Sequence, residues 1–358
     1  GGGEGGYGGP GRVAAGGGIM GGEDRCAVPN PSYYSDLGVT KFGPDVTASS
    51  SGPSPGPLRD VLAVVIVDSY QADLSALSMY GGEFKRVILA LVGAGLVKAA
   101  SEVRGAANIE VWEGCEKPGP AGAARKSELG GYTCAADVME SLGAESGGYA
   151  GVLVFQWDFW VIPRSRYFNG FDTSALWTLR PGIEINRSKG KRKKGDIHTV
   201  REVNMSNAAC GLKRSIAVHP AIAPIGLASG ARAKSELCGK EHRMEEACKN
   251  PRVVSFGWSG LFYVPRAAFE DWVKAARAFS SHDVFHEVAT PTIIDMIAAK
   301  TGRPPAIVMC AGSHSKITRW ARDGGAFEAL KGGQPCGFPA LLEEARPEVG
   351  GALAAAMA

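Results

Sequence analysis

Two continuous apolar runs constrain the fold of this chain more than any other feature of its 358 residues. The first, VLAVVIV at 61–67, leads into Asp68, and the second, GVLVF at 151–155, leads into Gln156-Trp157-Asp158. Runs without polar alternation are typical of strands that are buried on both faces, as in a parallel sheet. The sequence therefore predicts at least two central strands of such a sheet.

Further elements alternate with these runs. FKRVILALVGAG at 84–95 and NIEVWEGCE at 108–116 are strand candidates, and AIVMCAGSHSK at 306–316 is a late strand that enters a polar loop. A helix is predicted over 133–143, with Thr133 as its cap and Gly143 at its end. Strands that alternate with helices favour an α/β fold with a mostly parallel sheet flanked by helices.

Two helices are predicted in the second half of the chain. Pro265 suits the first turn of one helix, and Thr290 and Pro291 suit the cap and first turn of the next. One face of the former is apolar, because its large side chains recur at helical spacing: Phe269, Trp272, Val273, Ala276 and Phe279.

Composition divides the chain into three parts. Residues 1–58 are rich in Gly and Pro, and such a segment buries too little apolar surface to order itself, so we expect a disordered stem. One α/β domain is predicted over 59–330, with a basic loop at 186–196 and a polar insertion at 234–250. Residues 331–358 are expected to be a flexible tail.

The net charge and the length of the apolar runs limit the classes of partner that the sequence predicts for this chain. The net charge of +3 and pI of 8.4 are too mild to favour nucleic acid as the main partner. No run of about 18 apolar residues is present, so the sequence predicts no membrane insertion of this segment, and an anchor upstream of Gly1 stays open.

The chain has eight cysteines, none at the CxxC spacing of a structural zinc site. An even number permits disulfides, and Cys238 with Cys248 can close a short polar loop. The count alone leaves a secreted or lumenal compartment as one of two open alternatives.

Polar side chains follow four of the predicted strands. They are Asp68 with Ser69, Glu113, Asp158 and His314. Ligands of open α/β sheets bind beyond the carboxyl ends of the strands, so these groups are expected at one edge of one sheet. The structural alternatives are that Asp158 only forms a turn and that Asp68 only caps a helix.

A helix is followed by the segment GYAGVLVFQWDFWVIP, a variable middle and then GWSGLFYVPRAAFEDW. This layout resembles that of GT-A glycosyltransferases over about residues 60–320. In that superfamily a helix precedes a buried strand that ends in an acidic turn, and the turn holds a divalent metal and the diphosphate of a nucleotide sugar. The turn falls on 156–158, where Gln156 replaces the first acid and Asp158 keeps the second.

This resemblance implies a function and a set of roles. A divalent metal, Mn²⁺ or Mg²⁺, is held by Asp158 and His314 and offsets the charge of the leaving diphosphate. The nucleotide-sugar donor is bound through the groups at the strand ends: Asp68, Ser69, Glu113 and Asp158. The sugar passes to a hydroxyl of a glycan or protein acceptor, with Glu287 or Asp283 as the base.

The resemblance also implies a compartment, the secretory lumen (Golgi). Segment 257–266 takes the place of the acceptor-side segment, and the basic residues at 187–194 contact phosphates if their loop folds over the site.

Two other functions stay open. A non-catalytic α/β binding module is favoured by Gln156, which cannot carry charge. A nucleic-acid-associated protein would use the basic residues at 187–194 and the Gly-rich ends. The chain has no GxxxxGK[ST] loop and no HExxH motif.

Overall fold

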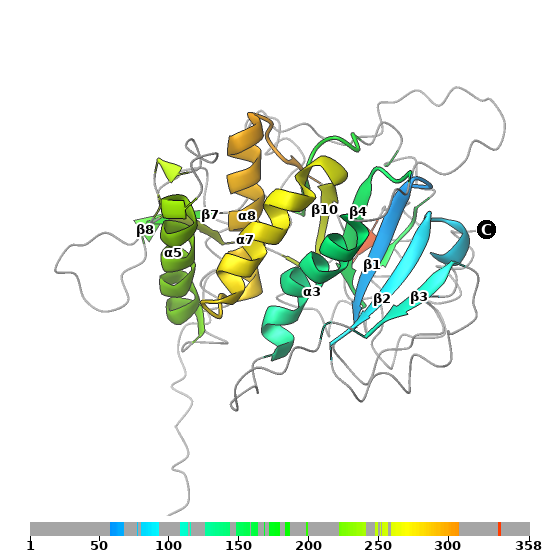
Figure 1. Cartoon of the computed structure of the whole chain (residues 1–358), viewed down its shortest axis with the longest axis horizontal. Helices are drawn as coiled ribbons and strands as arrows, with labels where there is room; N and C mark the ends of the chain where they lie inside the picture. Colours follow the sequence, from blue (N-terminus) through cyan, green and yellow to red (C-terminus); the bar gives the residue numbers. More distant parts are fainter. Residues whose placement is uncertain are drawn as a thin grey trace, which may run out of the picture.

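Figure 1 shows the structure of the chain, a computed structural model. It describes the residues in the following ranges: 58–67, 77, 80–92, 108–113, 115, 126–143, 148–157, 159–163, 168, 172–179, 183–186, 198–199, 222–240, 248–249, 251, 253–256, 259–307 and 336–337.

A seven-stranded sheet forms the centre of the molecule, in the order β11-β6-β10-β4-β1-β2-β3. Strands β1 to β4 run parallel to one another, and β10 runs antiparallel to its neighbours β4 and β6. The fold is thus α/β with a mostly parallel mixed sheet. The strand bounds are Val61–Val67 (β1), Arg86–Leu91 (β2), Ile109–Trp112 (β3), Gly151–Gln156 (β4), Trp177–Thr178 (β6), Leu261–Pro265 (β10) and Ala306–Ile307 (β11).

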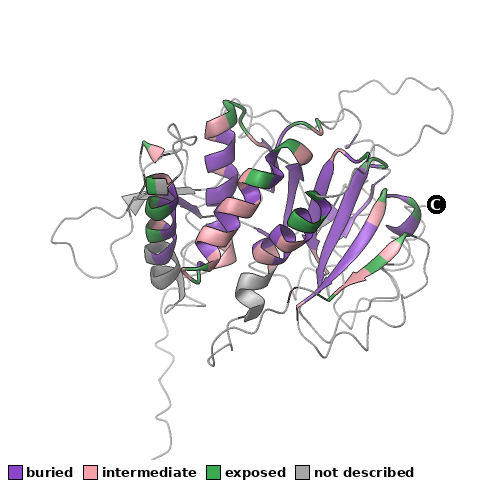
Figure 2. Cartoon of the chain, viewed as in Figure 1, coloured by how far each residue is buried: buried purple, intermediate pink, exposed green. Residues whose placement is uncertain are grey.

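Strand β1 is buried along its whole length because both faces of the sheet are covered (Figure 2). Leu62, Val64 and Ile66 belong to one apolar cluster, whereas Val61, Val65 and their alternate neighbours belong to another. Successive side chains of a strand point to opposite faces, so two covered faces require an uninterrupted apolar run. The prediction made from VLAVVIV is confirmed.

Three helices cover one face of the sheet: α3 (Lys126–Gly143), α7 (Phe269–Ser280) and α8 (His286–Thr301). The ring of Trp272 in α7 stacks on Phe262 of β10 with centroids 4.8 Å apart. Its indole N–H donates to the carbonyl oxygen of Tyr132 in α3 at 3.5 Å. Trp272 therefore joins two helices to the sheet.

The opposite face is covered by side chains from segments between the strands. Tyr80 is fully buried there, and its hydroxyl accepts the backbone N–H of Val161 at 3.0 Å. Trp160 is also fully buried. It lies in the short strand β5 (Trp160–Val161), which pairs with β12 (Cys336–Gly337). Residues 336–337 of the expected tail thus pair with the domain.

A smaller antiparallel sheet has the order β8-β7-β9, and helix α5 lies beside it. The bounds are Ile183–Asn186 (β7), His198–Thr199 (β8), Ile222–Lys240 (α5) and Val253–Phe256 (β9). Lys234 of α5 donates through Nζ to the carbonyl oxygen of Val253 at 2.9 Å. The polar segment 234–250 therefore begins inside a helix, with Leu237 buried.

Several predicted boundaries are confirmed and three are wrong. Gly143 ends α3, but the helix begins seven residues before the predicted cap Thr133. Pro265 ends β10 and precedes a short 3₁₀ helix, Arg266–Ala268, instead of lying inside α7. Thr290 and Pro291 lie within α8, which begins one turn earlier at His286. Phe285 precedes that start without a side-chain cap, so no capping residue marked it.

Candidate functional site

Three segments far apart in the sequence meet where β1 and β4 end. Ile66 and Gln156 are register partners in the parallel pair of β1 and β4. The N–H of Gln156 donates to the carbonyl oxygen of Gly260 at 3.0 Å, and the N–H of Trp157 donates to that of Ile66 at 2.9 Å. Because β10 is antiparallel, the residues just before it, Ser259 and Gly260, lie at the carboxyl edge of β1 and β4.

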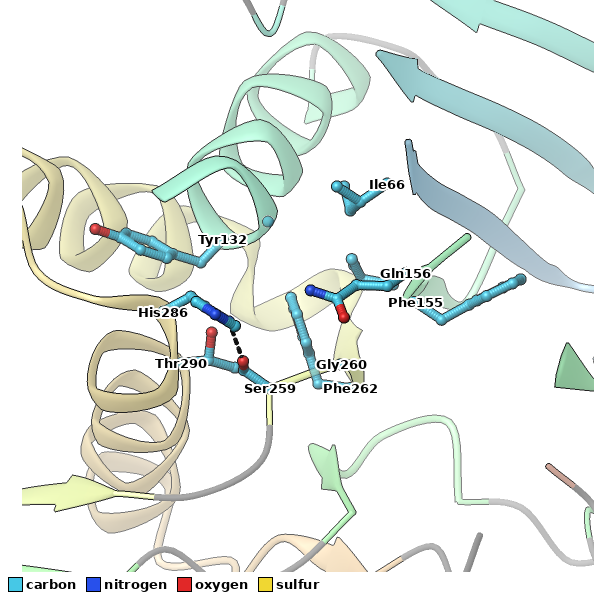
Figure 3. A pocket seen from close by; sticks show the side chains of 11 residues that line it. Ile66, Tyr132, Phe155, Gln156, Ser259, Gly260, Phe262, His286 and Thr290 are labelled. Atoms are coloured by element: carbon cyan, nitrogen blue, oxygen red, sulfur yellow. Dashed lines mark hydrogen bonds between the residues drawn. The ribbon is translucent and has the colours of Figure 1, made fainter. Parts of the chain in front are cut away.

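A pocket opens at this edge, between the sheet and helices α3 and α8 (Figure 3). Its position fits the rule that open α/β sheets bind ligands beyond the carboxyl ends of their strands. Its lining residues come from five segments: Ile66, Gly131, Tyr132, Val154, Phe155, Gln156, Ser259, Gly260, Phe262, His286 and Thr290.

Ser259 and His286 lie side by side in the wall of the pocket and are hydrogen-bonded between Oγ and Nδ1. Ser259 is only 8% exposed, so this contact is shielded from most solvent competition. The ring of Phe285 packs edge-on against the imidazole with centroids 4.5 Å apart. A serine hydroxyl and a histidine in contact form a pair that can move a proton.

Thr290 lines the same pocket one turn after His286, so the two residues lie on the same face of α8. It is 1% exposed, and its hydroxyl has no hydrogen-bond partner among the described residues. Thr292, equally buried, differs: its hydroxyl accepts the N–H of Ser255 at 2.9 Å and donates to the Ser255 carbonyl at 3.1 Å. A buried hydroxyl without a partner is costly, so the Thr290 hydroxyl is a candidate to hydrogen-bond a ligand in the pocket.

Tyr132 fixes the geometry of the helical wall. Its hydroxyl donates to the carbonyl oxygen of Val284 at 2.9 Å, which ties α3 to the turn before α8. Burial raises the pKa of the Tyr132 hydroxyl far above its ordinary value, and the charge of Asp283 raises it further. Tyr132 is therefore a neutral donor, and it places His286 relative to the sheet.

The predicted donor and metal residues are only partly described. Asp68, Ser69, Asp158 and His314 lie outside the described residues, as do the basic residues at 187–194. Asp158 directly follows Trp157, whose backbone belongs to the edge where the pocket lies. Glu113 is exposed after β3, which is three strands away from β4, or roughly 15 Å at the usual strand spacing.

The two predicted bases flank the histidine of the pocket. Asp283 is exposed and has a left-handed backbone with φ 49°, and Glu287 is half-buried in the first turn of α8. Neither belongs to the pocket lining, whereas His286 between them does. The two predicted bases thus lie in the same segment, 282–287, as a residue that lines the pocket.

Sequence reasoning missed four residues of the pocket. Ser259, His286, Thr290 and Tyr132 were not candidates, although GWSG at 257–260 lies in the segment assigned to the acceptor side. The spacing of four between His286 and Thr290 was the available signal. It was hidden because the helix was expected to begin at Thr290.

A metal site is not completed by the described residues. Among them, no group of three or more His, Cys, Asp or Glu side chains can hold a metal ion. Both expected ligands, Asp158 and His314, lie outside the described part of the chain.

Disulfides bond all the cysteines that the structure describes. Cys115 and Cys134 join the segment after β3 to α3, and Cys238 and Cys248 close the predicted loop after α5. Cys336 of β12 is disulfide-bonded as well.

Comparisons with models of protein families, with characterised proteins and with solved structures gave no match for this chain. In the described part of the chain, no helix is long and apolar enough to cross a membrane.

Proposed function

We propose that this protein is a glycosyltransferase that moves a sugar from a nucleotide-sugar donor to a hydroxyl of a glycan or protein acceptor. One observation carries the proposal: the ends of β1 and β4, the segment before β10 and the first turn of α8 share one pocket at the carboxyl edge of the sheet. These are the segments that the resemblance to GT-A enzymes assigns to donor, acceptor and base.

The pocket is small, with room for roughly one hydroxyl group, and its lining suits an uncharged one. It contains no Asp, Glu, Lys or Arg among the described residues. Gln156, Ser259, His286 and Thr290 instead offer amide, hydroxyl and imidazole groups. Neutral hydrogen-bonding groups compensate the desolvation of sugar hydroxyls, whereas an unpaired phosphate charge would be costly to bury here. The diphosphate therefore belongs outside this pocket.

The only ligands proposed for a divalent metal, Mn²⁺ or Mg²⁺, are Asp158 and His314. The described residues do not supply its ligand set. The chemistry proposed for the pocket therefore depends on its own side chains.

The disulfides support an oxidising compartment. Disulfides persist in secreted and lumenal proteins and are rare where thiols are kept reduced. The bonds Cys115–Cys134 and Cys238–Cys248 therefore favour the secretory lumen, which suits a glycosyltransferase of the Golgi type.

Thermal unfolding of the full chain with a panel of nucleoside diphosphates, with and without Mn²⁺, tests the proposal. A ligand at about 100 times its dissociation constant should stabilise the fold by about 2.7 kcal/mol. We expect a metal-dependent stabilisation that disappears in Asp158→Ala and persists in Glu270→Ala, which removes an exposed carboxylate of α7 that pairs with Lys274. Absence of any nucleotide response would contradict the donor site.

A non-catalytic binding module is the second candidate, and Gln156 favours it. This residue stands where the resemblance expects an acid, and its amide lines the pocket. A module of this kind would bind a nucleotide sugar without releasing nucleoside diphosphate, so a release assay separates the two functions.

A further inference from the structure

Two independent features of the pocket bear on how a hydroxyl would react there. The first is the hydrogen bond between Ser259 Oγ and His286 Nδ1. The second is the buried Thr290 hydroxyl, which has no partner among the described residues and lines the same pocket. Figure 3 shows the three side chains on one side of the pocket, with Gln156 opposite them.

We propose that Ser259 and His286 form a proton relay that deprotonates the attacking hydroxyl, and that Thr290 binds this hydroxyl in the pocket. This inference rests on the proposed transferase function and names a base that neither the resemblance nor the sequence assigned. Ser259 contacts the reacting hydroxyl, and His286 acts through Ser259.

The step balances without a further reactant. The Ser259 hydroxyl donates its hydrogen to Nδ1 of His286, and its oxygen accepts the hydrogen of the attacking hydroxyl. As the new bond forms between the attacking oxygen and the anomeric carbon, the bond from that carbon to the diphosphate oxygen breaks. The electron pair leaves with the diphosphate, one proton passes through Ser259 to His286, and His286 later returns it to solvent.

The titratable groups around His286 are few in the described part of the chain. Tyr132 faces it from α3 and stays neutral, because burial raises the pKa of its hydroxyl. Asp283 and Glu287 flank it along the chain, at the start of α8.

The position of His286 in the pocket is the reason to assign it, and not Asp283 or Glu287, as the base. A base must reach the hydrogen it removes directly or through one intermediate group. Asp283 and Glu287 are absent from the pocket lining, whereas Ser259 and His286 both line it and contact each other.

The test measures the release of nucleoside diphosphate from a panel of uridine- and guanosine-diphosphate hexoses, with water or simple sugars as acceptors. The variants are Ser259→Ala, His286→Gln and the double variant. The controls are Ser281→Ala, whose hydroxyl is exposed and donates to the Ala278 carbonyl, and His282→Gln, whose Nε2 pairs with Glu236 at 2.7 Å. Thermal unfolding of each variant separates loss of fold from loss of chemistry.

We expect each single variant to lower kcat by about 10²-fold or more, because general base catalysis contributes 10²- to 10⁴-fold. Residues that act as one unit are not additive, so the double variant should match the more damaging single change. The wild-type rate should fall as pH drops and His286 becomes protonated, and Ser259→Ala should lose this acidic limb. The controls should match wild type.

The outcomes separate this inference from the function on which it rests. Release that Ser259→Ala and His286→Gln leave unchanged, or that only Glu287→Gln or Asp283→Asn abolishes, would overturn the relay alone. Nucleotide binding without release would support the binding module and overturn the relay. Absence of both binding and release would overturn the transferase itself. If His286→Gln does not fold, the pH profile of Ser259→Ala decides the question.

Discussion

Gln156 and Gly260 are joined at the carboxyl edge of the sheet by a backbone hydrogen bond of 3.0 Å, from the N–H of Gln156 to the carbonyl oxygen of Gly260. A Cβ atom at position 260 would collide with the ring of Phe159 and would lie 3.4 Å from the side-chain oxygen of Gln156. The close approach of β4 and the start of β10 therefore requires glycine, and it sets Ser259 against the pocket.

Gly260→Ala should destabilise the fold by about 1–3 kcal/mol, because the added methyl group overpacks a buried aromatic contact. It should also displace Ser259 from His286 and reduce the activity proposed for the pocket. Chemical denaturation measures the first effect. Gly239→Ala in α5, where an added Cβ meets nothing within 4 Å, is the matched control and should leave stability unchanged or raise it.

Thr290 and Thr292 make a matched pair of buried hydroxyls two positions apart in α8. Thr292→Val should cost about 1–3 kcal/mol, because it leaves the N–H and carbonyl of Ser255 without their partner. Thr290→Val should change stability by less than about 0.5 kcal/mol or increase it, because its hydroxyl has no partner to lose among the described residues.

Thr290→Val, which should leave stability almost unchanged, should nevertheless impair function. Thr290→Val should weaken ligand binding or turnover although its fold is intact, and urea unfolding together with nucleotide release measures both. A Thr290→Val protein that loses as much stability as Thr292→Val would show that its hydroxyl is structural.

The parts of this fold that the sequence predicts well are those whose cause is local or periodic. VLAVVIV and GVLVF are buried on both faces, as their uninterrupted runs of apolar residues predict. The apolar face of α7 likewise follows from helical spacing, with Phe269, Trp272 and Phe279 buried. Strands of two to four residues, such as β6 and β8, are too short for a periodic signal, so the strands within 165–252 were not predicted.

The pocket was predictable as a place and not as a set of residues. The rule for strand ends points to the edge of the sheet where this pocket lies, because topology brings Ile66 and Gln156 together. Ser259 and Thr290 carry no charge and match no motif, so only the contact of α8 with the segment before β10 reveals them. The start of α8 at His286 was also obscured, because Phe285 supplies no side-chain cap.

Each disulfide should stabilise the fold, because the closed loop lowers the conformational entropy of the unfolded chain. The pairs Cys238–Cys248 and Cys115–Cys134 are separated by 10 and 19 residues, for which loop closure predicts roughly 3 kcal/mol each. Replacing either pair with serines should lower the free energy of unfolding by about this amount. Dithiothreitol should destabilise the wild type more than either double variant, and equal stability with and without reductant would contradict the role of these bonds.

Asp172 should give the fold a measurable acid dependence. Its carboxylate accepts hydrogen bonds from the Ser174 hydroxyl at 2.5 Å and from the Ser174 N–H at 2.9 Å. These two bonds lower the pKa of the carboxyl below 3.8, burial opposes them, and the charge of Arg303 adds to the lowering. A pKa that is lower in the folded state stabilises the fold above the unfolded value and loses this contribution as pH falls through the folded value.

Wild type should therefore exceed Asp172→Asn in free energy of unfolding at pH 6, and the difference should shrink steadily below about pH 4. The side chain is exposed, so the difference at pH 6 should stay below about 1 kcal/mol. Ser174→Ala removes the strongest of the bonds that lower the pKa, so it should flatten the acid dependence while the carboxylate remains. Urea unfolding from pH 2 to pH 6 measures all three proteins, and a difference that grows as pH falls would contradict the sign of the shift.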